Sequence, residues 1–428
     1  MSSRHAAADA MEQRVGRKLI LRIGGLLFLL YACFSLDRGN VGFAALEMNH
    51  DIGISEQIFG LGASLFTLCY LVFQVPNTML LRRLGPNRGF ALLAIAWGLV
   101  TSSSALIRNT GSFIGFRILL GCVEAGFHAY LVYYISQIFP RRTRGLAVGM
   151  AMSAVPLSQI VAAPISGALL NIDSGLQGWQ WLFIIEGLPA VLLGFVCFQL
   201  IPNTPHGARF LAADERAWLE REQHEPEQNS RHGGSVSSIR QVLWNPLIWG
   251  LGFVLFANVL GTNTFLFWMP QLIKEVSRAG YLEVGLLSML PWASFAAGML
   301  LLARLADSLA SPLQILCLGF ILSGIGFAFS SSPQASLAIV GLLLAAFGIG
   351  SAQSLIWAFT MRTVTGPASA SAYGLITVLG NGSGVLAHTI IGWARDATGS
   401  FAGVVIAISV CMLLAIGVLL AIGWRKGT

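Results

Sequence analysis

Long apolar runs follow one another along this chain, and each can cross a lipid bilayer as an α-helix, which takes about 20 residues. Only 11% of the residues are charged, against about 25% in an ordinary soluble domain. The alternation typical of membrane β-strands is absent, and Gly and Pro inside the runs are tolerated where helices pack together. We therefore predict an all-α membrane protein. Its twelve expected transmembrane helices lie near residues 19–44, 58–80, 89–107, 112–138, 145–170, 179–201, 246–272, 282–303, 312–332, 334–361, 369–393 and 400–424.

Lys and Arg residues indicate how these helices are oriented, because basic loops are retained on the cytoplasmic side of a membrane. With both termini in the cytoplasm, nearly all basic residues fall in cytoplasmic segments. The exceptions are Arg108, Lys274, Arg278 and Arg395 outside and Arg38 and Arg117 within spans. The net charge of +7 is then spread over loops that face anionic lipid headgroups, so the expected partner is the bilayer and not nucleic acid.

A polar segment divides the expected helices into two sets of six. It contains a helix-like piece and then a stretch with Gly, Ser and Pro that is typical of a flexible linker. We therefore expect an N-terminal six-helix bundle over residues 1–201, a cytoplasmic linker over 202–245 and a C-terminal six-helix bundle over 246–428. Two pseudo-symmetric bundles with a site near the bilayer midplane are typical of transporters that work by alternating access.

Two pairs of charged residues lie inside otherwise apolar spans: Asp37 with Arg38, and Arg117 with Glu124. Ions are costly inside a bilayer, so they usually mark a path for substrate or protons. Arg117 and Glu124 are seven residues apart, which places them on one helix face, about 10.5 Å apart along the axis. We expect these two to face each other along one wall of a cavity. The alternative is that each pair only holds helices together.

Five motifs occur in order along the chain: LDRGNVGFAAL, YLVFQVPNTMLLRRLGPNR, RILLGCVEAGF, GWQWLFIIEGLPA and FWMPQLIK. With them the chain resembles the anion:cation symporter family of the major facilitator superfamily along nearly its whole length. That family includes bacterial carriers of tartrate, phthalate, 4-hydroxyphenylacetate and galactonate, and it is related to the lysosomal sialic acid transporter. The resemblance implies the major facilitator fold. With the short loops, it also implies a bacterial inner (plasma) membrane.

The resemblance further implies that the chain imports a small organic anion together with protons. A guanidinium group matches a carboxylate with two hydrogen bonds, so Arg38 and Arg117 are expected to bind the anion. An incoming carboxylate would take an arginine away from Glu124 and Asp37. These two carboxyl groups would then hold protons during inward movement and release them to the cytoplasm. His128 lies one turn after Glu124 and is a candidate proton relay, although a hydrogen bond to a neighbouring helix explains it equally well.

Polar side chains elsewhere complete the candidate site. Tyr70 lies where relatives place a cavity tyrosine that bonds substrate oxygen, although packing between helices is an equal alternative. The second half has no charge deep in a span, so its share of the site is expected from Asn263, Gln353 and Asn381. Polar groups of this kind also hold helices together, for about 0.6 to 2 kcal/mol each. Glu186 is expected to be structural.

Other classes of protein are disfavoured. No Lys follows a Gly, so the phosphate-binding loop of an ATP-driven pump is missing. No nucleophile with a base and no set of metal ligands indicates an enzyme, a metal site or a cofactor; only His128 and His388 lie in spans, and His388 is expected to be structural. The remaining alternative is a proton-linked exporter or antiporter of a metabolite or drug. VAAPISGALL keeps only Pro164 and Gly167 of the signature of drug antiporters, which favours symport. We expect the protein to be a monomer.

Overall fold

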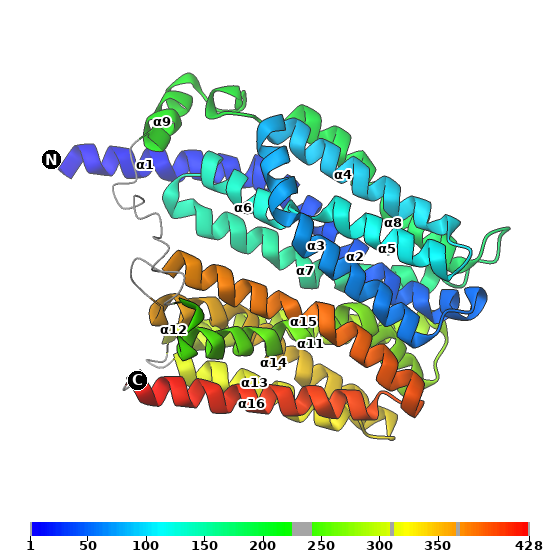
Figure 1. Ribbon diagram of the computed structural model, residues 1–428. Coiled ribbons are helices and arrows are strands. Elements are labelled where there is room, and N and C mark those ends of the chain that lie inside the picture. The colour runs from blue at the N-terminus through cyan, green and yellow to red at the C-terminus, as the bar shows by residue number, and fades with distance from the viewer. Residues whose placement is uncertain (1, 225–241, 309–311, 365–368, 427–428) are drawn as a thin grey trace.

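The computed structural model describes residues 2–224, 242–308, 312–364 and 369–426, and every regular element in these ranges is helical. The elements of the first half are α1 (Ser2–Leu19), the π-helix η1 (Ile20–Gly24), α2 (Gly25–Ile52), α3 (Glu56–Leu84), α4 (Pro86–Ser103), η2 (Ser104–Leu106), α5 (Thr110–Glu124), α6 (Phe127–Ile138), α7 (Arg141–Leu169), α8 (Gly178–Leu200), η3 (Pro205–Gly207) and α9 (Ala213–His224). Those of the second half are α11 (Pro246–Ser277), α12 (Tyr281–Ser308), α13 (Pro312–Ser330), α14 (Ala335–Thr363), α15 (Ser369–Thr398) and α16 (Ala402–Lys426). Figure 1 shows two groups of long helices, with both chain ends on one side, here called the side of the termini.

Twelve helical segments of the described residues are long and apolar enough to cross a membrane, and each corresponds to one predicted run. Large apolar side chains such as Leu192, Leu300 and Leu414 are exposed on the outer faces of these helices, where lipid tails would surround them. The prediction of an all-α membrane protein with twelve spanning helices in two bundles is confirmed. The chain is a multi-pass membrane protein.

The fourth predicted span is not one continuous helix. α5 ends at Glu124 and α6 begins at Phe127. Between them, Ala125 leaves the helical region with φ −56° and ψ 133°, and Gly126 has φ +91°, a conformation that favours glycine. The prediction of one helix over 112–138 is therefore wrong at this point. A glycine inside an apolar run does not by itself signal a break, since spanning helices commonly contain glycine.

The two bundles contact each other through α3 with α15, α7 with α12, and α2 with α11. Small residues allow their backbones to approach closely. A Cβ atom on Gly60 would overlap the carbonyl oxygen of His388, and one on Gly285 would overlap that of Ala163. These contacts lie at the end of the molecule opposite the termini, where α3 and α12 begin and α7 and α15 end.

Hydrogen bonds join the bundles at the same end. Asp396, near the end of α15, accepts bonds from the backbone N–H groups of Glu56 and Gln57 at the start of α3, at 3.2 and 2.9 Å. A carboxylate at this position satisfies N–H groups that have no partner within their own helix and is favoured by the helix dipole. Further along α3, the hydroxyl oxygens of Ser64 and Thr389 are 2.8 Å apart.

The predicted linker, residues 202–245, lies partly outside the described residues, which include 202–224 and 242–245 of it. Its helix α9 lies beside α1 (Figure 1), where the buried Glu215 carboxylate contacts Lys18 Nζ at 2.7 Å and Arg14 Nε at 2.8 Å. Burial alone would raise the pKa of Glu215. Hydrogen bonds from Lys18 and the Ala212 N–H, with the charges of Lys18 and Arg14, outweigh burial and hold that pKa below its usual value.

Candidate functional site

The predicted charged residues come together in the first bundle, but with partners that differ from the prediction. Arg38 Nε lies 3.3 Å from Glu124 Oε2, and the two side chains form an ion pair between α2 and α5. The Glu124 side chain is fully buried, whereas 22% of the Arg38 side chain is exposed. Arg117 lies close enough to Glu124 for their charges to interact, but its guanidinium group rests against the ring of Phe66, and the ion pair of Glu124 is the one with Arg38. The expectation that Glu124 and Arg117 line one cavity wall stays a prediction.

Asp37 does not pair with its neighbour Arg38. Both of its carboxylate oxygens lie 2.6 Å from the Thr101 hydroxyl of α4, which donates to them, and Oδ1 also accepts from Asn40 Nδ2 at 3.1 Å. The Asp37 carboxyl group also lies close enough to Glu124 for the two to interact electrostatically. Two neighbouring carboxylates repel each other, and this repulsion is relieved when one of them is protonated.

Aromatic rings surround both guanidinium groups. Arg38 Cζ lies 4.4 Å from the ring centroid of Phe34 and 4.3 Å from that of Tyr70. Arg117 Cζ lies 4.5 Å from the ring centroid of Phe66, which is also 5.3 Å from Arg38 Cζ. Each such cation–π contact contributes about 0.5 to 2 kcal/mol, depending on how far the cation is desolvated. Both guanidinium groups therefore contact the ring of Phe66.

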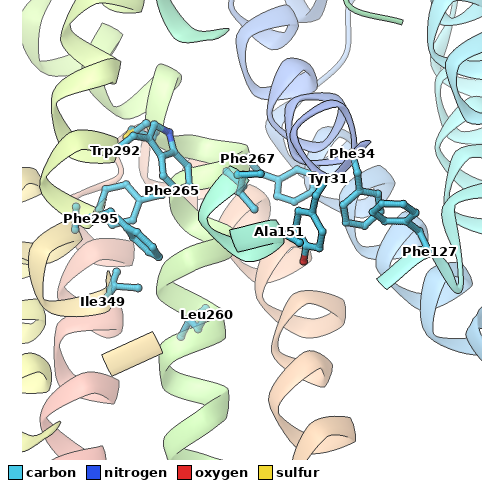
Figure 2. Close-up of a cluster of buried hydrophobic side chains, with 14 of the residues drawn as sticks. Tyr31, Phe34, Phe127, Ala151, Leu260, Phe265, Phe267, Trp292, Phe295 and Ile349 are labelled. Carbon is cyan, nitrogen blue, oxygen red and sulfur yellow. The ribbon is translucent and has the colours of Figure 1, made fainter. Parts of the chain in front are cut away.

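The aromatic lining extends from the first bundle to the second. Figure 2 shows Tyr31, Phe34 and Phe127 grouped together. The ring of Phe267 of α11 lies 6.4 Å from that of Phe66 in the first bundle. The ring of Phe267 is centred 5.7 Å from Arg117 Cζ. Arg117 thus lies where α11 meets the first bundle, which is the place where a site shared by two moving bundles has to be.

Several polar atoms of this site are buried without a hydrogen-bond partner among the described residues. They are Arg38 Nη2, Arg117 Nε and Arg117 Nη2, together with the carboxylate oxygen Glu124 Oε1. A buried donor without an acceptor costs about 1 to 3 kcal/mol, and more when the group is charged. Unpaired N–H groups on two neighbouring arginines are suited to bind an anionic group such as a carboxylate.

His128 extends the site along α6. Its Nδ1 lies 3.1 Å from the hydroxyl oxygen of Tyr31, and the two rings meet edge to face. Tyr31 was not among the predicted residues, although it lies two helical turns before Arg38 and so on the same face of α2. Phe34, one turn before Arg38, could have been found by the same spacing. Thr101 carries no comparable signal in the sequence.

The three predicted residues of the second bundle differ in their surroundings. Asn263 of α11 lies at the contact between the bundles, because a Cβ atom on Gly384 would be 2.9 Å from its Nδ2 and 3.0 Å from Thr67 of α3. Gln353 Oε1 is buried and has no donor among the described residues. Asn381 Nδ2 donates to a backbone carbonyl one turn earlier on its own helix, at 3.1 Å. The part of these three residues in the site stays a prediction.

Two other buried titratable side chains have neighbours that fit structural roles. Glu186 Oε1 accepts a hydrogen bond from Ser166 Oγ at 2.5 Å, and His388 Nδ1 accepts one from the Trp268 indole at 3.2 Å. Within the part of the chain that the structure describes, no three His, Cys, Asp or Glu side chains are grouped closely enough to hold a metal ion.

Twelve spanning helices in two bundles, with charged and aromatic residues buried where the bundles meet, define a secondary transporter of the alternating-access class. Comparison with known sequences leads to the same class. The chain matches the Major Facilitator Superfamily over residues 27–388 and belongs to that superfamily.

Named relatives and a solved structure support this assignment. The chain is 37% identical over 396 residues to the "Putative tartrate transporter" of Agrobacterium vitis, covering 92% of this chain and 91% of the relative. It is 32% identical to the "Quinolone resistance transporter" of Acinetobacter baumannii, covering 95% and 94% of the two chains. A crystal structure of a D-xylose-proton symporter has a TM-score of 0.74 at 15% identity, covering 94% of this chain and 97% of that chain, which shows the fold alone. The predicted resemblance and the major facilitator fold are confirmed.

Proposed function

We propose that this chain is a proton-coupled symporter that imports a small organic anion by alternating access. The observation that carries the proposal is the set of buried N–H groups on Arg38 and Arg117 that lack an acceptor among the described residues. A carboxylate accepts such groups in pairs and supplies the negative charge that two neighbouring guanidinium groups favour. The name of the tartrate transporter relative supports a substrate that carries carboxylates.

The ion pair between Arg38 and Glu124 provides a means of coupling. In the ion pair, Arg38 Nε lies 3.3 Å from Glu124 Oε2. A substrate carboxylate that binds both Arg117 and Arg38 would therefore compete with Glu124 for the Arg38 guanidinium. A buried carboxylate that loses its cation is strongly destabilised, so Glu124 takes up a proton and can share it with Asp37. Release of the anion restores the ion pair and frees the proton on the same side of the membrane.

We propose that the side of the termini faces the cytoplasm and that the protein lies in a bacterial inner membrane, as a monomer without a cofactor. The concentration of Lys and Arg in the segments on that side supports this orientation. The bundle contacts through Gly60, Gly285 and Asp396 would then close the site toward the outside. The domain division at 1–201, 202–245 and 246–428 belongs to the same proposal.

The test is transport by purified protein in liposomes that contain a pH-sensitive dye. The panel begins with tartrate and includes other dicarboxylates, sugar acids and aromatic acids. We expect one class of anion to acidify the interior as it enters. Glu124→Gln should abolish uptake driven by a proton gradient while exchange of labelled anion across the membrane continues. Glu186→Gln is a matched control, because it alters an equally buried carboxyl group of the same bundle and should keep proton-driven uptake. Wild-type net uptake by Glu124→Gln would refute the coupling role.

A second candidate function is a proton-linked exporter or antiporter of a metabolite or drug. The name of the quinolone resistance transporter relative favours this second function. The same liposomes distinguish the two functions by the sign of the pH change. A symporter carries protons inward with its substrate and acidifies the interior, whereas an antiporter exchanges them and makes the interior alkaline.

A further inference from the structure

We propose that Asn77 is a positioning residue for Glu124. Its amide group stabilises the interruption between α5 and α6, which follows directly after Glu124, the last residue of α5. The inference rests on the proposed function in one respect, which is the role of Glu124 as the group that carries the proton. Asn77 itself belongs to α3 and contacts neither arginine of the site in the interactions described above.

The Asn77 side chain bonds to two backbone carbonyls at the break. Its Nδ2 donates to the carbonyl oxygens of Cys122 at 2.7 Å and Ala125 at 3.0 Å. In a continuous helix these carbonyls would accept from the N–H groups of Gly126 and Ala129, four residues further on. The interruption removes those partners, and the bilayer interior offers no bulk water to replace them. Both hydrogens of one amide group therefore take the place of two helical hydrogen bonds.

The backbone at the break is also fitted closely to α3. A Cβ atom on Gly126 would lie 3.0 Å from Thr78 Oγ1 and 3.2 Å from Asn77 Cβ. Gly126 moreover has a positive φ of 91°, which a residue with a side chain adopts only with strain. A glycine and an asparagine on different helices thus maintain one local conformation.

The position of Glu124 depends on this conformation because Glu124 is the last residue of α5. Its bond to Arg38 is long for a charge-assisted hydrogen bond, 3.3 Å against about 2.8 Å, so a small displacement would change its strength. Loss of the Asn77 amide would let α5 and α6 join into one helix or let water reach the carbonyls. Either change moves Glu124 relative to its charged and titratable neighbours, which are Asp37 and Arg38 from α2, Tyr70 from α3, and Arg117 from α5.

The experiment is a pH titration of the carboxylic acid band by infrared difference spectroscopy, on the purified full chain in lipid. The component of this band that disappears in Glu124→Gln belongs to Glu124, and its titration can be followed without a known substrate. We expect Asn77→Ala to shift the midpoint of this component by about one pH unit. Asn258→Ala is the matched control, since the Asn258 amide likewise donates to a carbonyl of another helix, Ile349 O at 3.1 Å. It should lower thermal stability comparably and leave the midpoint unchanged.

A second variant guards against misfolding of the first. Gly126→Ala disturbs the same break without altering Asn77 and should also shift the Glu124 midpoint. An unshifted midpoint in both folded variants would overturn the inference and leave Asn77 with a structural role only. Proton-driven uptake that survives in Glu124→Gln would instead defeat the proposed function, while the infrared midpoint would still decide whether Asn77 positions the carboxyl group.

Discussion

Arg38 and Arg117 carry the same guanidinium group but contact different partners. Arg38 is paired with Glu124, whereas Arg117 lies against Phe66 with its Nε and Nη2 unpaired among the described residues. Arg117 can therefore accept a carboxylate without breaking an existing ion pair. Arg38 can do so only by releasing Glu124. This difference makes Arg117 the expected first contact for an anion and Arg38 the residue through which binding reaches the proton site.

Replacement of Arg117 by lysine should separate charge from hydrogen-bond geometry. A lysine keeps the positive charge but offers a carboxylate no planar pair of N–H groups, so the apparent affinity for the transported anion should fall about tenfold or more. Arg117→Ala should reduce it further. The measurement is the KM of uptake in liposomes, with the exposed loop residue Arg108→Ala as control. Unchanged KM in both variants at position 117 would contradict the assignment.

The helix α9 shows how an element outside the membrane is attached to the first bundle. Glu215 is buried against Lys18 and Arg14, and its pKa is held below the usual value. A carboxylate with a lowered pKa in the folded state stabilises that state above the ordinary glutamate pKa, about 4.3, and loses this effect as the pH falls through the lower value. At neutral pH the contact is complete.

Glu215→Gln should therefore loosen α9, because glutamine keeps the size of the side chain but loses its charge. Hydrogen exchange at neutral pH should become faster in residues 213–224 than in the wild type. Asp214→Asn, which changes the exposed neighbouring residue, is the control and should keep wild-type exchange. In the wild type we expect protection of α9 to persist down to about pH 4.3 and to fall below it. Equal protection in Glu215→Gln would show that apolar packing alone holds the helix.

The twelve spanning helices could be predicted from the sequence because apolar length alone determines a span. The break after Glu124 could not, because it depends on an amide group that Asn77 supplies from another helix. The pairing of Glu124 also escaped prediction. A spacing of seven residues determines which side chains share a helix face, but only packing decides that Arg38 forms the ion pair with Glu124. Phe34 was within reach of prediction, since it precedes Arg38 by one turn.

At the scale of the whole molecule, the bundle contacts named above share one end. Gly60 and Ser64 of α3, Gly285 of α12 and Asp396 of α15 all lie far from the termini. The charged site lies deeper, in the first bundle and at its contact with α11. Alternating access requires these contacts to separate while each bundle stays intact. Their combined strength therefore sets how often the site opens to that side.

Replacing Asp396 should change the equilibrium between the closed and open arrangements of this end without altering the charged site. Asp396 belongs to the second bundle and accepts hydrogen bonds from the first two N–H groups of α3, so Asp396→Asn weakens bonds that exist only in the closed arrangement. The open population should rise about two- to fivefold. Spin labels at Gln57 and Ala397 would report this as a larger fraction of long distances in pulsed electron resonance.

Asp173→Asn, in the loop between α7 and α8 on the same side of the molecule, is the matched control and should leave the distances unchanged. Since the residues proposed to bind the substrate and the proton lie elsewhere, Asp396→Asn should also keep the proposed coupling of uptake to protons while changing the rate of uptake. A distance distribution identical to that of the wild type would show that the Asp396 carboxylate does not stabilise the closed arrangement at this end.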